Sequence, residues 1–128
     1  YNRMLIIIAV LEKKVGLNLS NQDIYVNITG GLRVDDPAVD LAVAAAIASA
    51  YRDRPLPAEL VAMGEIGLTG ELRPVSQPEQ RFREAVRLGF GNVVAAPLKS
   101  GAAAAKKLDL KLYSAANLQI ALSFMGLI

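Results

Sequence analysis

A long apolar segment, Leu41 to Tyr51, restricts the fold of this 128-residue chain more than any other feature. Alanine, valine, isoleucine and leucine fill this segment except at Ser49 and its final tyrosine. Just upstream, Asp36 and Pro37 are typical of a helix start, because aspartate caps free N–H groups and proline suits the first helical position. We therefore predict a helix over residues 38–52. A helix that is apolar nearly all round is buried on several sides, in a core or at a subunit interface.

Strands and helices are predicted to alternate along the rest of the chain. Segments rich in β-branched residues predict strands, and apolar residues at helical spacing predict helices. Leu68-Thr69-Gly70 has the composition of a hairpin tip. This pattern predicts one mixed α/β (α+β) domain over residues 1–128, a length sufficient for a core of its own. The predicted strands are residues 23–29, 60–66, 71–75, 92–96 and 110–113, and the predicted helices are residues 4–14, 38–52, 76–88, 101–107 and 115–124.

The helix predicted after the hairpin has a recognisable start. Ser76 is followed three residues later by Glu79, the spacing of a capping box in which each side chain bonds to the other residue's backbone N–H. Phe82, Ala85 and Val86 recur at helical spacing and form the predicted core face. The cap accounts for the Ser76 hydroxyl without a catalytic role.

Composition excludes several kinds of site. The chain contains neither cysteine nor histidine, which removes disulfides, thiolate nucleophiles, imidazole bases and the usual zinc ligands. Its net charge of +2 is too small to indicate nucleic-acid binding by itself. The longest apolar runs are shorter than the roughly 20 residues of a membrane-spanning helix, and no signal peptide is recognisable. We expect a cytoplasmic protein without membrane contact. Because the chain begins at Tyr1, we also expect it to be a fragment of a longer protein.

Two blocks of sequence resemble a known family. The first is GGLRV followed by DPAVDLAVA, residues 30–34 and 36–44, and the second is GEIGLTGELRPV, residues 64–75. Both resemble the proteolytic domain of Lon-type Ser-Lys peptidases. The segment up to about Pro97 is similar to the Lon-protease-like domain at the C-terminus of RadA-type bacterial DNA-repair proteins. The resemblance implies a Lon-like sandwich of βαβ units with a β-hairpin.

The same resemblance indicates that the peptidase chemistry is missing. It places Ala38 where the active peptidases have their nucleophilic serine, and Arg81 where they have their catalytic lysine. A methyl group cannot attack a carbonyl, and a guanidinium stays protonated and cannot act as a general base. The nearest alternative hydroxyls, Ser76 and Thr69, have no lysine or histidine positioned to activate them. We therefore expect this domain not to be an enzyme, and a peptidase with a displaced dyad is the weaker alternative.

A metal site at the start of the apolar helix is a further alternative. Asp35, Asp36 and Asp40 place three carboxylates there. Carboxylates at a helix start more commonly cap the helix and interact with its dipole. We therefore expect no metal in this chain.

The resemblance also implies partners. RadA-type proteins combine a zinc-binding motif and an ATPase core with a domain of this kind, and act on DNA as hexamers. ATP, magnesium and zinc therefore belong to the parent family and not to this chain, which has no phosphate-binding loop motif. We expect DNA and further copies of the chain, in a homohexameric ring, as partners. A pure oligomerisation scaffold without DNA contact is the alternative.

Arginines are the candidate DNA contacts, because they could neutralise backbone phosphates on the inner side of such a ring. The pattern alone favours an ordinary solvated helix face, since Glu79 and Arg83 have the spacing of an i,i+4 ion pair. The family resemblance is what makes DNA contact as well supported as a solvated helix face. The predicted DNA-binding residues are Arg33, Arg73, Arg81 and Arg83.

Overall fold

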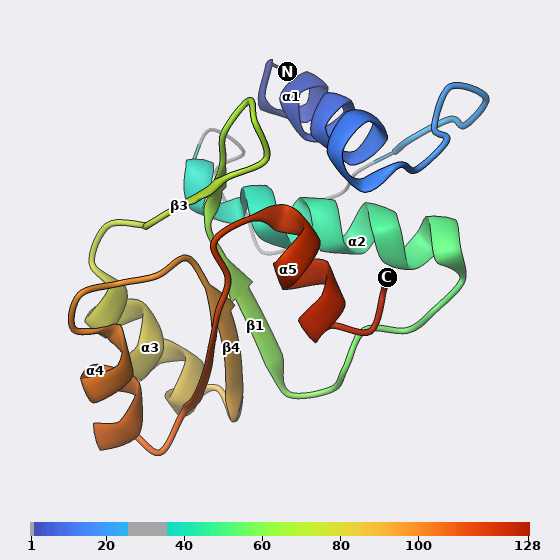
Figure 1. Ribbon diagram of the computed structural model, residues 1–128. Coiled ribbons are helices and arrows are strands. Elements are labelled where there is room, and N and C mark those ends of the chain that lie inside the picture. The colour runs from blue at the N-terminus through green and yellow to red at the C-terminus, as the bar shows by residue number, and fades with distance from the viewer. Residues whose placement is uncertain (1, 26–35) are drawn as a thin grey trace.

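A computed structural model describes residues 2–25 and 36–128, and Figure 1 shows the arrangement of its elements. The described residues form a mixed α/β fold, which confirms the predicted class. Within them, no helix is both long and apolar enough to cross a bilayer. The elements are α1 (Asn2–Val10), a π-helical turn η1 (Leu11–Val15), a 3-10 turn η3 (Pro37–Val39), α2 (Asp40–Arg52), β1 (Leu60–Met63), β2 (Glu65–Ile66), β3 (Leu72–Arg73), α3 (Pro78–Arg87), β4 (Asn92–Ala95), α4 (Gly101–Lys107), β5 (Lys111–Ser114) and α5 (Leu118–Phe124).

A parallel sheet of order β1-β4-β5 lies at the centre of the fold. Parallel neighbours require crossover connections, which α3 supplies between β1 and β4 and α4 supplies between β4 and β5. Successive residues of a strand face opposite sides of a sheet. Accordingly Val94 packs into one apolar cluster, whereas Val93 and Ala95 pack into the other.

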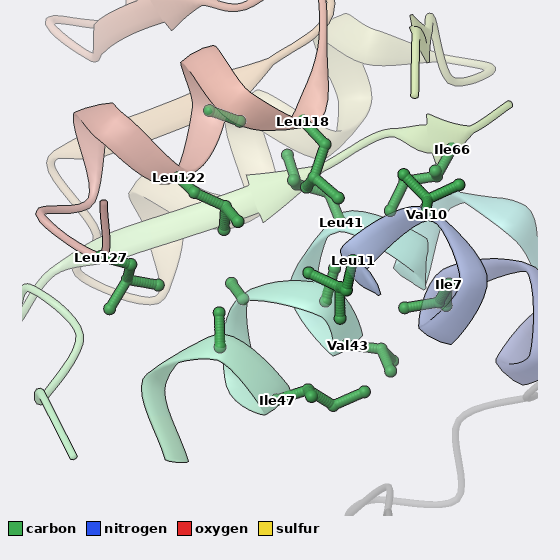
Figure 2. Close-up of a cluster of buried hydrophobic side chains, with 14 of the residues drawn as sticks. Ile7, Val10, Leu11, Leu41, Val43, Ile47, Ile66, Leu118, Leu122 and Leu127 are labelled. Carbon is green, nitrogen blue, oxygen red and sulfur yellow. The ribbon is translucent and has the colours of Figure 1, made fainter. Parts of the chain in front are cut away.

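Helices cover both faces of this sheet. On one face α2 and α5 lie against the strands, and α1 packs on the outside of α2 (Figure 1). Their side chains interlock in the larger core, where Leu41, Leu118 and Leu122 meet Leu11 and Ile7 (Figure 2). On the other face α3 and α4 bury a smaller core around Phe82 and Ala105.

The apolar helix forms as the sequence predicts. Asp36 caps it, since its Oδ1 accepts the Ala38 N–H at 3.0 Å, and Pro37 opens the first turn. That turn is a 3-10 helix, and the α-helix begins at Asp40. Buried residues occur on several sides of α2, as expected for a helix without a polar stripe, and they are Asp40, Leu41, Val43, Ala44, Ala45, Ile47 and Ala48.

The strand predicted over residues 60–66 is wrong as a single element. Gly64 divides it into β1 of the parallel sheet and β2, which pairs with β3 in a short antiparallel hairpin. The Gly64 backbone forms hydrogen bonds with the start of α2. Its N–H donates to the Ala38 carbonyl at 3.1 Å, and its carbonyl accepts the Leu41 N–H at 3.0 Å. These long-range hydrogen bonds replace the sheet pairing that a continuous strand would have made.

The capping box predicted at Ser76 and Glu79 is also wrong. Helix α3 begins at Pro78, and the residue before it, Gln77, has φ 52° and ψ 53° and no side-chain capping bond. A capping box would have required Gln77 to be the first helical residue. Proline disfavours the α-helical conformation in the residue before it, so Pro78 itself takes the first position. Val86, predicted to be core, is partly exposed, while Phe82 and Ala85 are buried.

Other boundaries differ by a few residues. The first helix is α1 followed by the π-helical turn, and Gly16, in the left-handed conformation, ends it. Helix α5 begins only at Leu118, because Asn117 is its cap and accepts the Ile120 N–H. The strand predicted over 23–29 lies outside the described residues from Val26 onward, and residues 23–25 are not in a strand.

Candidate functional site

The positions predicted to be the vestiges of a Ser-Lys dyad are brought together by one carboxylate. Asp36 accepts the Ala38 N–H through Oδ1, and its Oδ2 lies 3.6 Å from a terminal nitrogen of Arg81. Arg81 is held further by its Nε, which donates to the Ser76 carbonyl at 2.8 Å. Loop 36–39 and the first turn of α3, more than forty residues apart in the chain, are thereby linked through a single side chain.

Neither Ala38 nor Arg81 offers a nucleophile or a general base. The Ala38 methyl is buried, and its carbonyl is occupied by the Gly64 N–H. The Arg81 guanidinium is always charged and only donates hydrogen bonds. What the arrangement provides chemically is a partly exposed cation beside a helix start.

The hydroxyls considered as substitutes serve the turn geometry. Thr69 lies at the hairpin tip, and both its N–H (3.2 Å) and its Oγ1 (2.6 Å) donate to Glu71 Oε1. The Thr69 hydroxyl, followed by the backbone N–H of Glu71 and by Arg73, lowers the pKa of the Glu71 carboxyl to about 2. A carboxylate with so low a pKa is a poor base for activating a hydroxyl.

Glu71 also explains a glycine in this turn. A Cβ built on Gly67 would lie 2.2 Å from the Glu71 carboxyl carbon, so a larger residue would displace this carboxylate from its place in the turn. Gly70, with φ +89°, completes the turn in a conformation that side chains disfavour. The Glu71 carboxylate therefore stabilises the hairpin turn through its hydrogen bonds with Thr69. Arg73 takes part in the same group of contacts through its ion pair with Glu71.

The predicted DNA-binding arginines do not form one free cationic surface. Arg73 lies 3.0 Å from Glu71, Arg81 lies 3.6 Å from Asp36, and Arg83 lies 4.0 Å from Glu79. The last pair has the i,i+4 spacing that the sequence predicted. Arg33 lies outside the described residues. Each of the three described arginines is thus accompanied by a carboxylate.

A largely buried ion pair that the sequence did not predict lies beside this region. Asp40, at the start of α2, is fully buried and contacts Arg3 of α1 through both carboxylate oxygens. Its Oδ2 also accepts the Ile66 N–H at 3.0 Å, and Arg3 donates to the Ile66 carbonyl at 2.9 Å. Glu65 lies 3.7 Å from Arg3. This cluster joins α1, α2 and β2.

One feature of the sequence could have pointed to this pair. Arg3 and Asp40 are charges of opposite sign at the beginnings of two apolar helices. A charge that enters a core requires a partner.

The carboxylates considered for a metal site are otherwise engaged. Asp36 caps a helix and Asp40 binds Arg3, whereas Asp35 lies outside the described residues. In the part of the chain that the structure describes, no group of three or more carboxylates is positioned to hold a metal ion.

Comparison with known proteins identifies the family. A family model described as subunit ChlI of Mg-chelatase matches residues 4–98. The chain is 54% identical over 93 residues to the DNA repair protein RadA of Listeria monocytogenes, which covers 73% of this chain and 20% of that protein. It is 54% identical over 95 residues to RadA of Streptococcus pyogenes, with 74% and 21% covered. For RadA of Halalkalibacterium halodurans the values are 52% over 94 residues, with 73% and 21% covered.

The chain thus matches about a fifth of the length of these relatives. Their names confirm the resemblance to RadA-type proteins that the two sequence blocks predicted. Because the family model matches well over half of the chain, the chain belongs to the family described as subunit ChlI of Mg-chelatase.

Proposed function

We propose that this chain is the catalytically inactive, Lon-like domain of a RadA-type DNA-repair ATPase, and that it assembles a homohexameric ring and contacts DNA without sequence preference. The observation that carries the proposal is the pair Ala38 and Arg81, joined through Asp36, in a chain whose relatives are named DNA repair protein RadA. A segment that is linked to α3 through Asp36 but offers no nucleophile is suited to binding or assembly.

Exposed apolar side chains support the assembly part of the proposal. Leu5, Leu68 and Leu88 are each more than half exposed, on α1, the hairpin tip and the end of α3. Because they lie on separate elements, they suit a ring in which each copy contacts two neighbours through different surfaces.

The DNA part of the proposal rests on exposed cations. Arg73, Arg81 and Arg83 remain candidates, because an exposed ion pair is weak, at most about 1 kcal/mol, and a phosphate can replace the carboxylate. Arg33 belongs to the same proposed set on the sequence alone. In the parent protein, which we propose to be cytoplasmic, ATP, magnesium and zinc would be bound by segments other than this chain.

A scaffold without DNA contact is the second candidate function. The carboxylate beside each described arginine favours it, because that carboxylate reduces the local positive potential. The two candidates differ in one observable property, the dependence of DNA binding on these arginines.

The experiment is to measure the mass of the chain by light scattering and its affinity for duplex DNA at two salt concentrations in the same buffers. A hexamer whose affinity falls steeply with salt supports the proposal. A hexamer without DNA binding supports the scaffold. The Arg73→Gln/Arg81→Gln/Arg83→Gln variant should lose affinity without changing mass. Turnover of an unfolded protein substrate, or labelling by a serine-reactive phosphonate, would refute catalytic inactivity.

A further inference from the structure

The parallel sheet has an open edge at β5. The N–H groups of Lys111 and Ala115 donate to backbone carbonyls on the β4 side, so every second residue of β5 bonds to the sheet. The residues between them, Leu112 and Ser114, therefore direct their N–H and carbonyl groups away from the sheet. Within the described part of the chain, no group forms a hydrogen bond with them. Such a row of unpaired groups is a template for a further strand.

The pairing that the chain itself provides stops short of this edge. Just beyond β5, the Leu72 N–H of the hairpin donates to the Ala116 carbonyl at 2.9 Å, in an antiparallel arrangement. If this register continued along β5, the next residue to bond would be Pro74, opposite Ser114. Proline has no N–H to donate, so the hairpin does not extend along the edge.

Each side of the edge offers a surface for the side chains of an added strand. On the α4 side lies an open hollow of about 400 Å³, whose lining includes Ala102 and Leu112. On the α5 side the Tyr113 ring packs against Phe124, with 5.2 Å between ring centres. Lys111 lies on that side too, with its Nζ 5.3 Å from the centre of the Tyr113 ring. Alternate side chains of an added strand would therefore meet two different surfaces.

An ordinary explanation accounts for part of this arrangement. Lysines on edge strands discourage pairing between copies of a protein, which explains the exposed Lys111. That explanation leaves the hollow beside Leu112 without a role. It also leaves Ile120 and Phe124, which are 40% and 46% exposed on α5, without a reason to be apolar.

Charge indicates which strand suits the edge. Residues 99–128, which form the edge and its surroundings, contain four lysines and a single aspartate, so two copies of this edge repel each other. The hollow itself has little preference for charge, because Lys106 and Asp109 line it with opposite signs. On the α5 side Lys111 favours an acidic side chain.

We propose that the β5 edge binds an extended segment of a partner protein in which apolar and acidic side chains alternate. The segment runs antiparallel to β5, in the direction that the hairpin takes beside Ala116. Its backbone bonds to Leu112 and Ser114 and provides the affinity, while alternate side chains provide the specificity. Directly opposite residues of an antiparallel pair share a side of the sheet, so the apolar side chains enter the hollow and the acidic ones lie near Lys111. This contact is separate from the DNA contact and the ring proposed above.

The first test uses peptides and leaves the protein unchanged. The probe is a short fluorescein-labelled peptide of alternating valine and glutamate, and fluorescence anisotropy measures its binding to the full chain. It should bind, whereas a peptide of alternating valine and lysine should not. N-methylation of the valines should weaken binding by about tenfold or more, because the valine N–H groups donate to β5. N-methylation of the glutamates should be tolerated, since their N–H groups point to solvent. Equal binding of the two methylated peptides would exclude strand pairing and overturn the inference.

A variant of the edge itself provides the second test. Ser114→Pro removes a donor that faces the added strand but none that bonds to β4. It should weaken binding of the valine–glutamate peptide by about fivefold or more, the effect of one hydrogen bond. Ser114→Ala, which keeps the N–H, is the matched control and should bind like the wild type. Circular dichroism verifies that both variants are folded.

The role of charge is tested at Lys111. Lys111→Gln should weaken binding of the valine–glutamate peptide by up to about fivefold, the effect of one exposed ion pair. Lys99→Gln removes an exposed cation from the segment before α4 and should have no effect. Lys111→Glu should remove the preference for glutamate over lysine in the peptide. A preference that survives this change would overturn the assignment of the acidic side chains to Lys111.

The outcomes are distinguishable from those that test the proposed function. No binding of the valine–glutamate peptide would overturn this inference and leave the ring and the DNA contact untouched. A dimer in light scattering that Ser114→Pro dissociates would assign the edge to a second copy of the chain, and would overturn the inference as well.

Discussion

Two aspartate–arginine pairs flank the start of α2, and they differ in burial. Asp40 is fully buried, and its partner Arg3 is mostly covered, with a side chain 23% exposed. Asp36 and Arg81 are 44% and 31% exposed, and their charged atoms are 3.6 Å apart. In the first pair the Asp40 carboxylate depends on Arg3, because water cannot reach it to replace a lost partner. In the second pair water can do so, which leaves Arg81 free to exchange Asp36 for another anion.

The largest effect is expected for Arg3→Met. The substitution leaves the Asp40 carboxylate buried without its cation and should lower the free energy of unfolding by about 3 kcal/mol. Urea denaturation measures the change. Arg52→Met, which removes an exposed cation at the end of α2, is the matched control and should cost less than about 0.5 kcal/mol. Equal stability of the two variants would show that the Arg3–Asp40 pair contributes little.

Combining Arg3→Met with Asp40→Asn should restore part of that loss. The asparagine oxygen still accepts the Ile66 N–H but carries no charge that requires a partner. We expect the double variant to be more stable than Arg3→Met by about 1 kcal/mol, measured in a double-mutant cycle. Additive losses would contradict the direct coupling that the contact implies.

Asp36→Ala is expected to cost about 1 kcal/mol, which is the typical cost of losing an N-cap. The loss comes from the hydrogen bond to the Ala38 N–H and not from the ion pair with Arg81. Asp36→Ser, which keeps a capping oxygen without the charge, should therefore retain most of the stability. If the serine variant is as unstable as the alanine variant, the charge of Asp36 matters more than its cap.

The contrast between the two pairs also shows what could be predicted from the sequence. The Asp36 cap and the helix after it were predictable, because all of their determinants lie within a few consecutive residues. The Arg3–Asp40 contact joins residues 37 positions apart, and no local pattern specifies which buried charge meets which.

The error at Gly64 has the same long-range origin. Gly64 leaves the strand because its backbone bonds to Ala38 and Leu41, far away in the chain. Ala38 and Arg81 could be proposed as former dyad positions only from a family resemblance, and their link through Asp36 depends on how α3 packs. At Ser76 the failure was local, since the restriction that Pro78 places on Gln77 outweighs the capping-box spacing.

A smaller effect is expected at the hairpin, where an exposed carboxylate is held by short-range bonds. The Glu71 pKa of about 2, against an ordinary 4.5, means that the folded hairpin favours the ionised form. Its stabilising contribution is present above about pH 4.5 and is lost as the pH falls from 4.5 towards 2. Thr69→Val removes the largest cause and should raise the Glu71 pKa, followed by NMR of the side-chain carboxyl carbon. Arg73→Gln should raise the pKa less, and the reverse order would show that the ion pair dominates.

The smallest effect on stability is expected for Arg81→Gln. An exposed ion pair contributes at most about 1 kcal/mol, and glutamine can still donate to the Ser76 carbonyl, so the free energy of unfolding should fall by less than about 0.5 kcal/mol. A loss as large as that of Arg3→Met would make Arg81 a structural residue that holds α3 against the start of α2. A negligible loss leaves binding as the use for a guanidinium at this position, because neither catalysis nor stability would account for it.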